Sequence, residues 1–180
     1  MAEKKRNKKQ IRLQDIKKNL QGHYDYMGPV YVFGGESADY KQFRLRAWTL
    51  SLICALCAIA GGIVPATGAM DTWYVILPYG ATVLSAGLVI YRVVQWTQNN
   101  GVLREYTYEK AGKGFPINIK GLMASATITL VMEIYHLARY GMGEYPIGAL
   151  ILVISMALTI VFGRMLDIEV SRQSWTRFNQ

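Results

Sequence analysis

An apolar run of about twenty residues that carries ionisable side chains constrains this chain more than any other feature. The run extends from Ile119 to Arg139 and is long enough to cross a bilayer as a helix. Glu133 and His136 lie within it, and both are expensive to expose to lipid. The sequence therefore predicts a spanning helix whose polar side chains face protein or a wet cavity.

The polar residues of this run share one face of the predicted helix. At 3.6 residues per turn, side chains spaced by threes and fours form one stripe: Leu122, Ser125, Ala126, Thr129, Glu133, His136 and Tyr140. The remaining faces are apolar and suit lipid. Because the stripe needs cover, we expect the other apolar segments to pack against it as a bundle.

Three further apolar runs supply that cover, and the fold class predicted is an all-α integral membrane protein with four transmembrane helices. The spans are expected at about residues 47–64, 73–96, 119–140 and 146–165. A basic and aromatic segment precedes them at residues 1–46, a polar loop is expected at 97–118, and a short tail at 166–180. The first span starts too far into the chain for a signal peptide, so we expect it to be retained.

Basic residues predict the orientation. Eleven of the twenty Lys and Arg residues precede residue 47, and most of the others lie in the middle loop or near the C-terminus. By the positive-inside rule, both termini and the middle loop are expected in the cytoplasm of a cell-membrane protein. The net charge of +8 is thereby explained by orientation and by attraction to anionic lipids at the cytoplasmic face, so no nucleic-acid partner is expected.

Glu133 and His136 are the strongest candidates for a functional site, with Thr129 and Tyr140 on the same stripe. Lying three residues apart, Glu133 and His136 are neighbours on a helix and suit a proton relay. The structural alternative is that Glu133 bonds His136, Tyr74 or Tyr79 and only holds the bundle together. A Glu-x-x-His pair also resembles half of a di-iron site, but one copy is too little, and no metal is expected.

Cys54 and Cys57 form a Cys-x-x-Cys pair inside the first span. No basic residue is close enough to stabilise a thiolate, and no second pair exists for a relay. We expect two small packing residues. Small residues recur at intervals of four in the first span (Cys54, Ala58 and Gly62) and in the second (Ala81 and Ser85), which favours close helix contacts.

Two aromatic segments outside the spans suggest places where a partner docks. Their candidate residues are Tyr24, Tyr26, Tyr31, Phe33, Tyr40, Tyr106 and Tyr108. Val30–Phe33, closed by two glycines, favours a short strand or an extended docking segment. Alternating residues from Glu105 to Glu109 indicate a second strand. The other interpretation is an ordered linker at the membrane interface, where Tyr is favoured.

No catalytic, phosphate-binding or dinucleotide-binding motif is present, so no catalytic residue, enzyme activity or cofactor is expected. The leading functional interpretation is a non-enzymatic accessory or scaffold subunit of a membrane complex. Its partners would be other membrane subunits or further copies of the chain. The alternative is a small transporter or proton-coupled channel that uses Glu133 and His136, and a membrane thiol oxidoreductase comes third.

Overall fold

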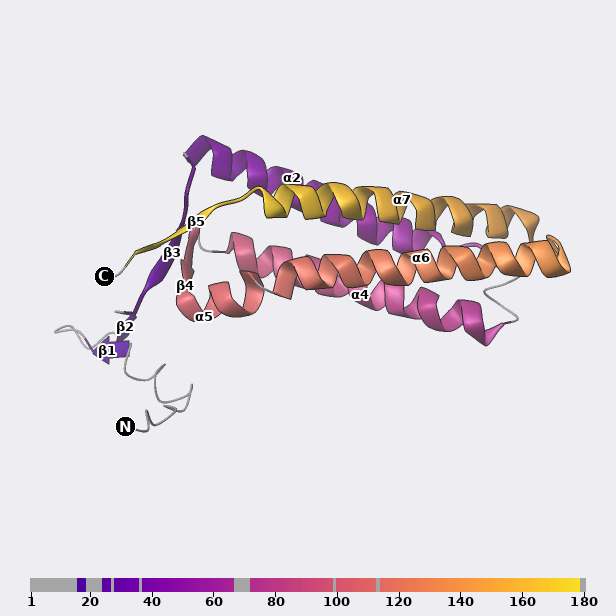
Figure 1. The fold of residues 1–180 in the computed structure, drawn as a ribbon, viewed down its shortest axis with the longest axis horizontal. Coiled ribbons are helices and arrows are strands. Elements are labelled where there is room, and N and C mark those ends of the chain that lie inside the picture. Colours follow the sequence, from indigo (N-terminus) through magenta and orange to yellow (C-terminus); the bar gives the residue numbers. More distant parts are fainter. Residues whose placement is uncertain are drawn as a thin grey trace, which may run out of the picture.

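Four long helices dominate the computed structural model (Figure 1). It describes residues 16–18, 24–26, 28–35, 37–66, 72–98, 100–112 and 114–178, with backbone alone for 16–18, 24–26, 37 and 38. The helices are α2 (Ser37–Ala60), α4 (Trp73–Thr97), α6 (Gly114–Tyr140) and α7 (Pro146–Ser171). Each has the length and apolar composition to cross a membrane, which agrees with a multi-pass membrane protein.

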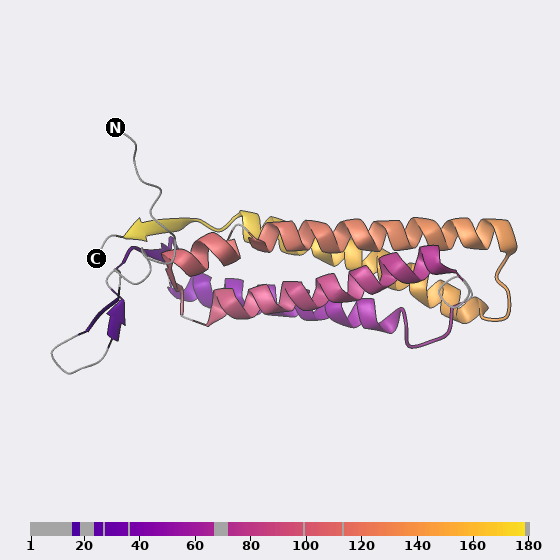
Figure 2. The ribbon, with the colours of Figure 1, turned by 90° about the horizontal axis from the view of Figure 1, so that it is seen from below.

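The four helices form a bundle in which each packs against two neighbours. α4 lies against α6, α6 against α7, α7 against α2 and α2 against α4. Two views at right angles show the same elongated arrangement, with the connections from α2 to α4 and from α6 to α7 at one end (Figures 1 and 2). The connection from α4 to α6 lies at the other end, which places consecutive helices antiparallel.

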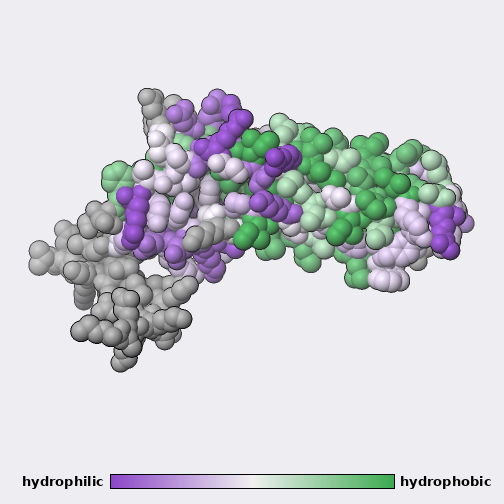
Figure 3. Space-filling view, viewed as in Figure 1, coloured by the Kyte–Doolittle hydropathy of each residue, from purple (hydrophilic) through white to green (hydrophobic). Residues whose placement is uncertain are grey.

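Surface hydropathy matches this arrangement. Apolar residues cover the visible flank of the bundle, while polar residues gather over one end and again at the opposite tip (Figure 3). The helices have 24 to 27 residues, or about 36–40 Å at 1.5 Å per residue, which exceeds the bilayer core of about 30 Å. Both polar ends can therefore lie outside the hydrocarbon.

A small antiparallel sheet closes one end of the bundle. β3 (Val30–Phe33) pairs with β4 (Val102–Arg104) on one side and with β5 (Trp175–Phe178) on the other. A separate pair joins β1 (Ile16–Lys18) to β2 (Tyr24–Tyr26). The all-α prediction did not include this sheet, because its strands are only three or four residues long and pair across large sequence separations.

The strand expected at Glu105–Glu109 was wrong, whereas the one at Val30–Phe33 is present. Glu105–Thr107 is the one-turn helix α5, and Tyr108–Gly112 is the π-helical turn η1. The strand of this segment, β4, precedes the alternating residues and ends at Arg104. Helical winding turns Tyr108 toward Tyr31, whose ring it stacks on at 3.9 Å between centroids.

Three helices extend beyond the lengths that hydropathy predicts. α2 starts ten residues before Ala47, α6 starts at Gly114 inside the expected loop, and α7 continues to Ser171 inside the expected tail. Their polar ends carry residues that pack at the sheet, including the buried Phe43 and Phe115. Hydropathy reports only the apolar part of a helix, so these polar turns are missed.

Small residues bring the helices together within one chain. Cys54 and Ala58 of α2 are fully buried, and the Sγ atom of Cys54 lies 4.0 Å from the carbonyl oxygen of Thr159 on α7. Gly62 adjoins the ring of Tyr79 from α4. Ala81 is exposed and Ser85 only half-buried, because the inward face of α4 is instead that of Thr82, Ala86 and Val89.

The contact of α7 with the chain that follows α2 gives a test with a matched control. A Cβ atom added at Gly148 of α7 would overlap the carbonyl oxygen of Pro65, whereas one at Gly80 of α4 meets nothing within 4 Å. Gly148→Ala should destabilise the bundle by about 1–3 kcal/mol through overpacking. Gly80→Ala should be neutral or slightly stabilising, because Ala favours helix. Equal melting temperatures of the two variants in detergent would contradict the packing described here.

Candidate functional site

The predicted stripe of α6 forms a buried polar column, except at its last residue. Thr129 and Glu133 are fully buried and His136 is 5% exposed, whereas Tyr140 is 63% exposed. All four lie in the half of the helix that ends at Tyr140. Glu133 lies seven residues from that end, which is about 10 Å at 1.5 Å per residue. An ionisable side chain is thus enclosed by protein within the apolar length of the helix.

Two polar contacts between α4 and α6 bracket Glu133. One turn to one side, the hydroxyls of Thr82 and Thr129 lie 3.4 Å apart. One turn to the other, the hydroxyl of Tyr74 and the Nδ1 atom of His136 are 3.0 Å apart and form a hydrogen bond. The His136 ring also lies 5.0 Å, between centroids, from that of Tyr140. Glu133 therefore lies at the interface between α4 and α6, which we call the Glu133 seam.

The hydroxyl groups near this seam bond mainly within their own helices. Thr82 donates to the carbonyl of Pro78 and Thr129 to that of Ser125, each at 2.9 Å. On α7, Thr159 donates in the same way to Ser155 at 2.8 Å. Such bonds satisfy a hydroxyl without a partner from another molecule, so these threonines act as small packing residues.

Tyr79, the other aromatic partner proposed for Glu133, turns toward α2. Its hydroxyl donates to the carbonyl of Ala58 at 3.0 Å. Ala58 lies near the end of α2, where orphan carbonyls need donors. The two tyrosines therefore have different partners. Tyr74 bonds to the imidazole of His136, and Tyr79 bonds to the backbone of α2.

The cysteine pair lies at a packing contact. Cys54 is fully buried against α7, and Cys57 is half-buried. Both thiols are free. This placement gives Cys54 the surroundings of a small apolar side chain.

Most of the candidate docking aromatics pack inside the protein. Tyr31 stacks on Tyr108, and Phe33 contacts Tyr40 at 5.4 Å between centroids. Tyr106 is 40% exposed. Tyr24 and Tyr26 belong to β2, and their side chains lie outside the described residues.

Two tryptophans complete this aromatic cluster, and neither was a site candidate from sequence. Trp96 of α4 and Trp175 of β5 lie 5.3 Å apart between centroids, and Phe33 lies 5.7 Å from Trp175. The cluster joins the sheet to the bundle. The high aromatic content of the segments outside the spans is the sequence signal for it, although that content does not reveal which rings meet.

Asp167 is a buried carboxylate that the sequence reasoning also missed. It is 5% exposed and accepts a hydrogen bond from the guanidinium of Arg164 at 2.9 Å. The sequence assigned it to a solvated tail, yet it lies on the inward face of α7 near the sheet. An i,i+3 pair of opposite charge was visible in the sequence and was the available signal.

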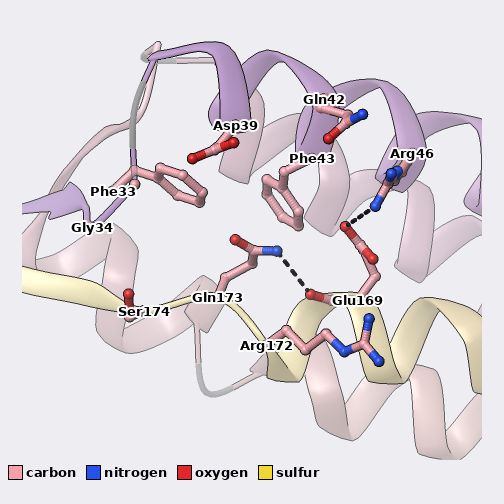
Figure 4. Close-up of a pocket in the computed structure, with 11 residues that line it drawn as sticks. Phe33, Gly34, Asp39, Gln42, Phe43, Arg46, Glu169, Arg172, Gln173 and Ser174 are labelled. Carbon is pink, nitrogen blue, oxygen red and sulfur yellow. Dashed lines mark hydrogen bonds and ion pairs between the residues drawn. The ribbon is translucent and has the colours of Figure 1, made fainter.

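Three cavities lie away from the Glu133 seam. The first, of about 290 Å³, lies at the junction of β3 with α2 and of α7 with β5, where Arg46 forms a 3.6 Å ion pair with Glu169 (Figure 4). A second of about 450 Å³ lies on the other side of the same junction. The third, of about 550 Å³, is an apolar groove between α2 and α4.

The Tyr74–His136 hydrogen bond can be tested directly because the chain has only two histidines. Selective ¹⁵N labelling of His gives few ring signals, and those of His136 are assigned with a His136→Gln variant. Tyr74→Phe removes the hydroxyl 3.0 Å from Nδ1 and should shift that nitrogen's resonance. Tyr91→Phe, on the exposed face of the same helix, should leave it unchanged. An unchanged Nδ1 signal in Tyr74→Phe would show that the bond does not form.

Among the described residues, no cluster of three His, Cys, Asp or Glu side chains is placed to hold a metal ion. No protein-family model, curated protein sequence or solved structure matches this chain.

Proposed function

We propose that the chain is a cell-membrane protein whose sheet end, with both termini and the α4–α6 connection, lies in the cytoplasm. The basic residues support this orientation, because those that the structure describes gather mainly at the sheet end, as Arg46, Arg104 and Arg172 do. At the opposite end, Trp73, Tyr140 and Tyr145 are 42–73% exposed, as expected of an interfacial aromatic belt.

Within that placement, we infer a role as a non-enzymatic accessory subunit of a membrane complex. The observation that carries this role is the outward face of α4. Within its most apolar stretch, 22% of α4 is buried in the bundle, against 39% of the corresponding stretch of α7. On that face the Cβ positions of Gly80 and Gly87 meet nothing within 4 Å, and Leu84 between them is 73% exposed. Two glycines seven residues apart permit close approach of a further helix in lipid.

The interior supports the same role. Its threonines bond to carbonyls of their own helices, and the three cavities described above lie away from Glu133. The aromatic segments outside the spans contribute their rings to the aromatic cluster that joins the sheet to the bundle. The outward helix faces are thus the surfaces best suited to a partner, and that partner would be another membrane subunit.

A photo-reactive side chain on α4 tests the accessory role. Placed at Leu84, and with the chain at native expression level, it should capture a different membrane protein that also co-purifies in mild detergent. Placed at Val161, which is 54% exposed on α7, it should capture lipid. Gly87→Leu should weaken the Leu84 adduct by obstructing helix approach. Lipid adducts alone at Leu84, or adducts of a second copy of this chain, would contradict the heteromeric role.

The orientation has an independent test. In a background with both cysteines changed to Ala, Glu144→Cys should react with a membrane-impermeant maleimide added to intact cells. Lys110→Cys, in the connection at the sheet end, should react only after the membrane is opened. Both positions are exposed in the structure. Labelling of Lys110→Cys in intact cells would reverse the orientation.

A proton-coupled transporter is the second candidate, and the enclosure of Glu133 beside the Tyr74–His136 bond favours it. Glu133→Gln keeps the shape of the side chain and abolishes proton exchange. Under the accessory role, both assembly and cellular activity should survive across about pH 5–8, the range in which His titrates. Normal assembly with lost activity would instead establish the proton-coupled role. Glu144→Gln, in the exposed loop, is the matched control.

A further inference from the structure

The cavities on the two sides of the β3–α2 junction differ in charge. The one in Figure 4 is lined by Arg46 and Arg172 together with Asp39 and Glu169, so its formal charges balance. The described residues that line the second cavity, of about 450 Å³, include Lys41 and Arg44 and none that is acidic. Its volume lies within the range of small-molecule sites. Two cations, with no carboxylate among the described residues of the lining, favour an anion.

The walls of the second cavity are built from elements that the fold holds in place. Phe33 of β3 and Tyr40 of α2 contribute aromatic rings to the wall, and Gly101, with φ of 87°, adjoins the Tyr40 ring. A Cβ atom at Gly101 would approach the Tyr40 ring to 3.4 Å. The backbone of Phe33 donates to the carbonyl of Gly101 at 3.0 Å, which fixes the turn at Gly101 against β3. The cavity wall is therefore formed by elements that bond to one another.

Lys41 and Arg44 are available to a ligand. Both are exposed, and neither forms an ion pair with a carboxylate among the described residues. They lie three residues apart on α2, which puts them on adjacent positions of one helix face. Arg46, in contrast, is paired with Glu169 across the other cavity.

The same face of α2 continues into the membrane. Leu45, Leu52 and Leu56 follow Lys41 at helical spacing and are 68%, 45% and 65% exposed. Arg44 and Lys41 precede Ala47, where the apolar run starts, by about 4.5 and 9 Å along the helix. The headgroup layer on each side of the bilayer is about 5–8 Å thick. A phosphate held by the two cations would have its acyl chains directly beside the exposed leucines.

We propose that this cavity binds the phosphate headgroup of an anionic phospholipid of the cytoplasmic leaflet. Lys41 and Arg44 contact the phosphate, Phe33 and Tyr40 line the headgroup cavity, and the acyl chains lie along Leu45 and Leu52. The inference rests on the proposed membrane placement with the sheet end in the cytoplasm. It differs from general attraction to basic residues in that it assigns one defined site.

The test uses the full chain, purified and reconstituted in phosphatidylcholine vesicles with trace spin-labelled phosphatidylglycerol or phosphatidylcholine. Electron paramagnetic resonance gives the relative association constant of the two probes. The unmodified chain should prefer phosphatidylglycerol, and Lys41→Gln with Arg44→Gln should reduce that preference about five-fold or more. Lys110→Gln with Arg172→Gln removes the same charge at exposed positions on the same end and should retain the preference.

A second variant separates the cavity from diffuse charge. Val102→Phe fills the cavity, keeps both cations, and suits a strand position that is 42% exposed. It should reduce the preference, and full retention would overturn the proposal. Equal loss in the two double variants, or equal displacement by free glycerol phosphate and by unlabelled phosphatidylglycerol, would overturn it as well. The binding measurement needs neither a partner subunit nor a known orientation, so its failure is distinguishable from failure of the proposed function.

Discussion

Glu133 and His136 lie within the apolar length of α6, and enclosing them is the constraint on which the bundle depends. A carboxyl group facing lipid carries a penalty of several kcal/mol, so the α6 face that contains it must meet protein. In the structure that face meets α4, with the Thr82–Thr129 and Tyr74–His136 contacts on either side of Glu133. The burial of this acidic residue thereby limits how α6 can be rotated, because its polar face meets α4.

The remaining contacts between the helices are of the kind that suits packing in lipid. Because apolar residues gain little by leaving lipid for protein, close contact of small residues must hold the other helices. Gly148 lies against Pro65, and Cys54 lies against the backbone of α7 at Thr159. At the sheet end the protein buries the rings of Trp96, Phe115 and Phe43 beneath a sheet, which is the packing that the hydrophobic effect favours in water. The two ends of one bundle are thus stabilised differently.

How far the sequence predicts this structure depends on the range of the interaction concerned. The stripe from Leu122 to His136 follows from helical spacing and intramembrane polarity, and the structure buries it as a unit. The sheet does not follow, since Val32 pairs with Val102 and Thr176, partners 70 and more residues away. The aromatic residues were visible as a composition, but only tertiary structure turns Tyr31 and Tyr108 toward each other. Tyr140 leaves the stripe because the helix ends there, beyond the cover of its neighbours.

The enclosure of Glu133 is tested most directly by a nitroxide scan along residues 127–138 of α6 in bilayers. Accessibility to oxygen should oscillate with the helical period, with minima at Thr129, Glu133 and His136. Maxima should fall at Val131 and Ile134, which are 55% and 49% exposed. A maximum of oxygen accessibility at Glu133, or an oscillation shifted by half a turn, would contradict the central claim that this helix turns its ionisable face into the bundle.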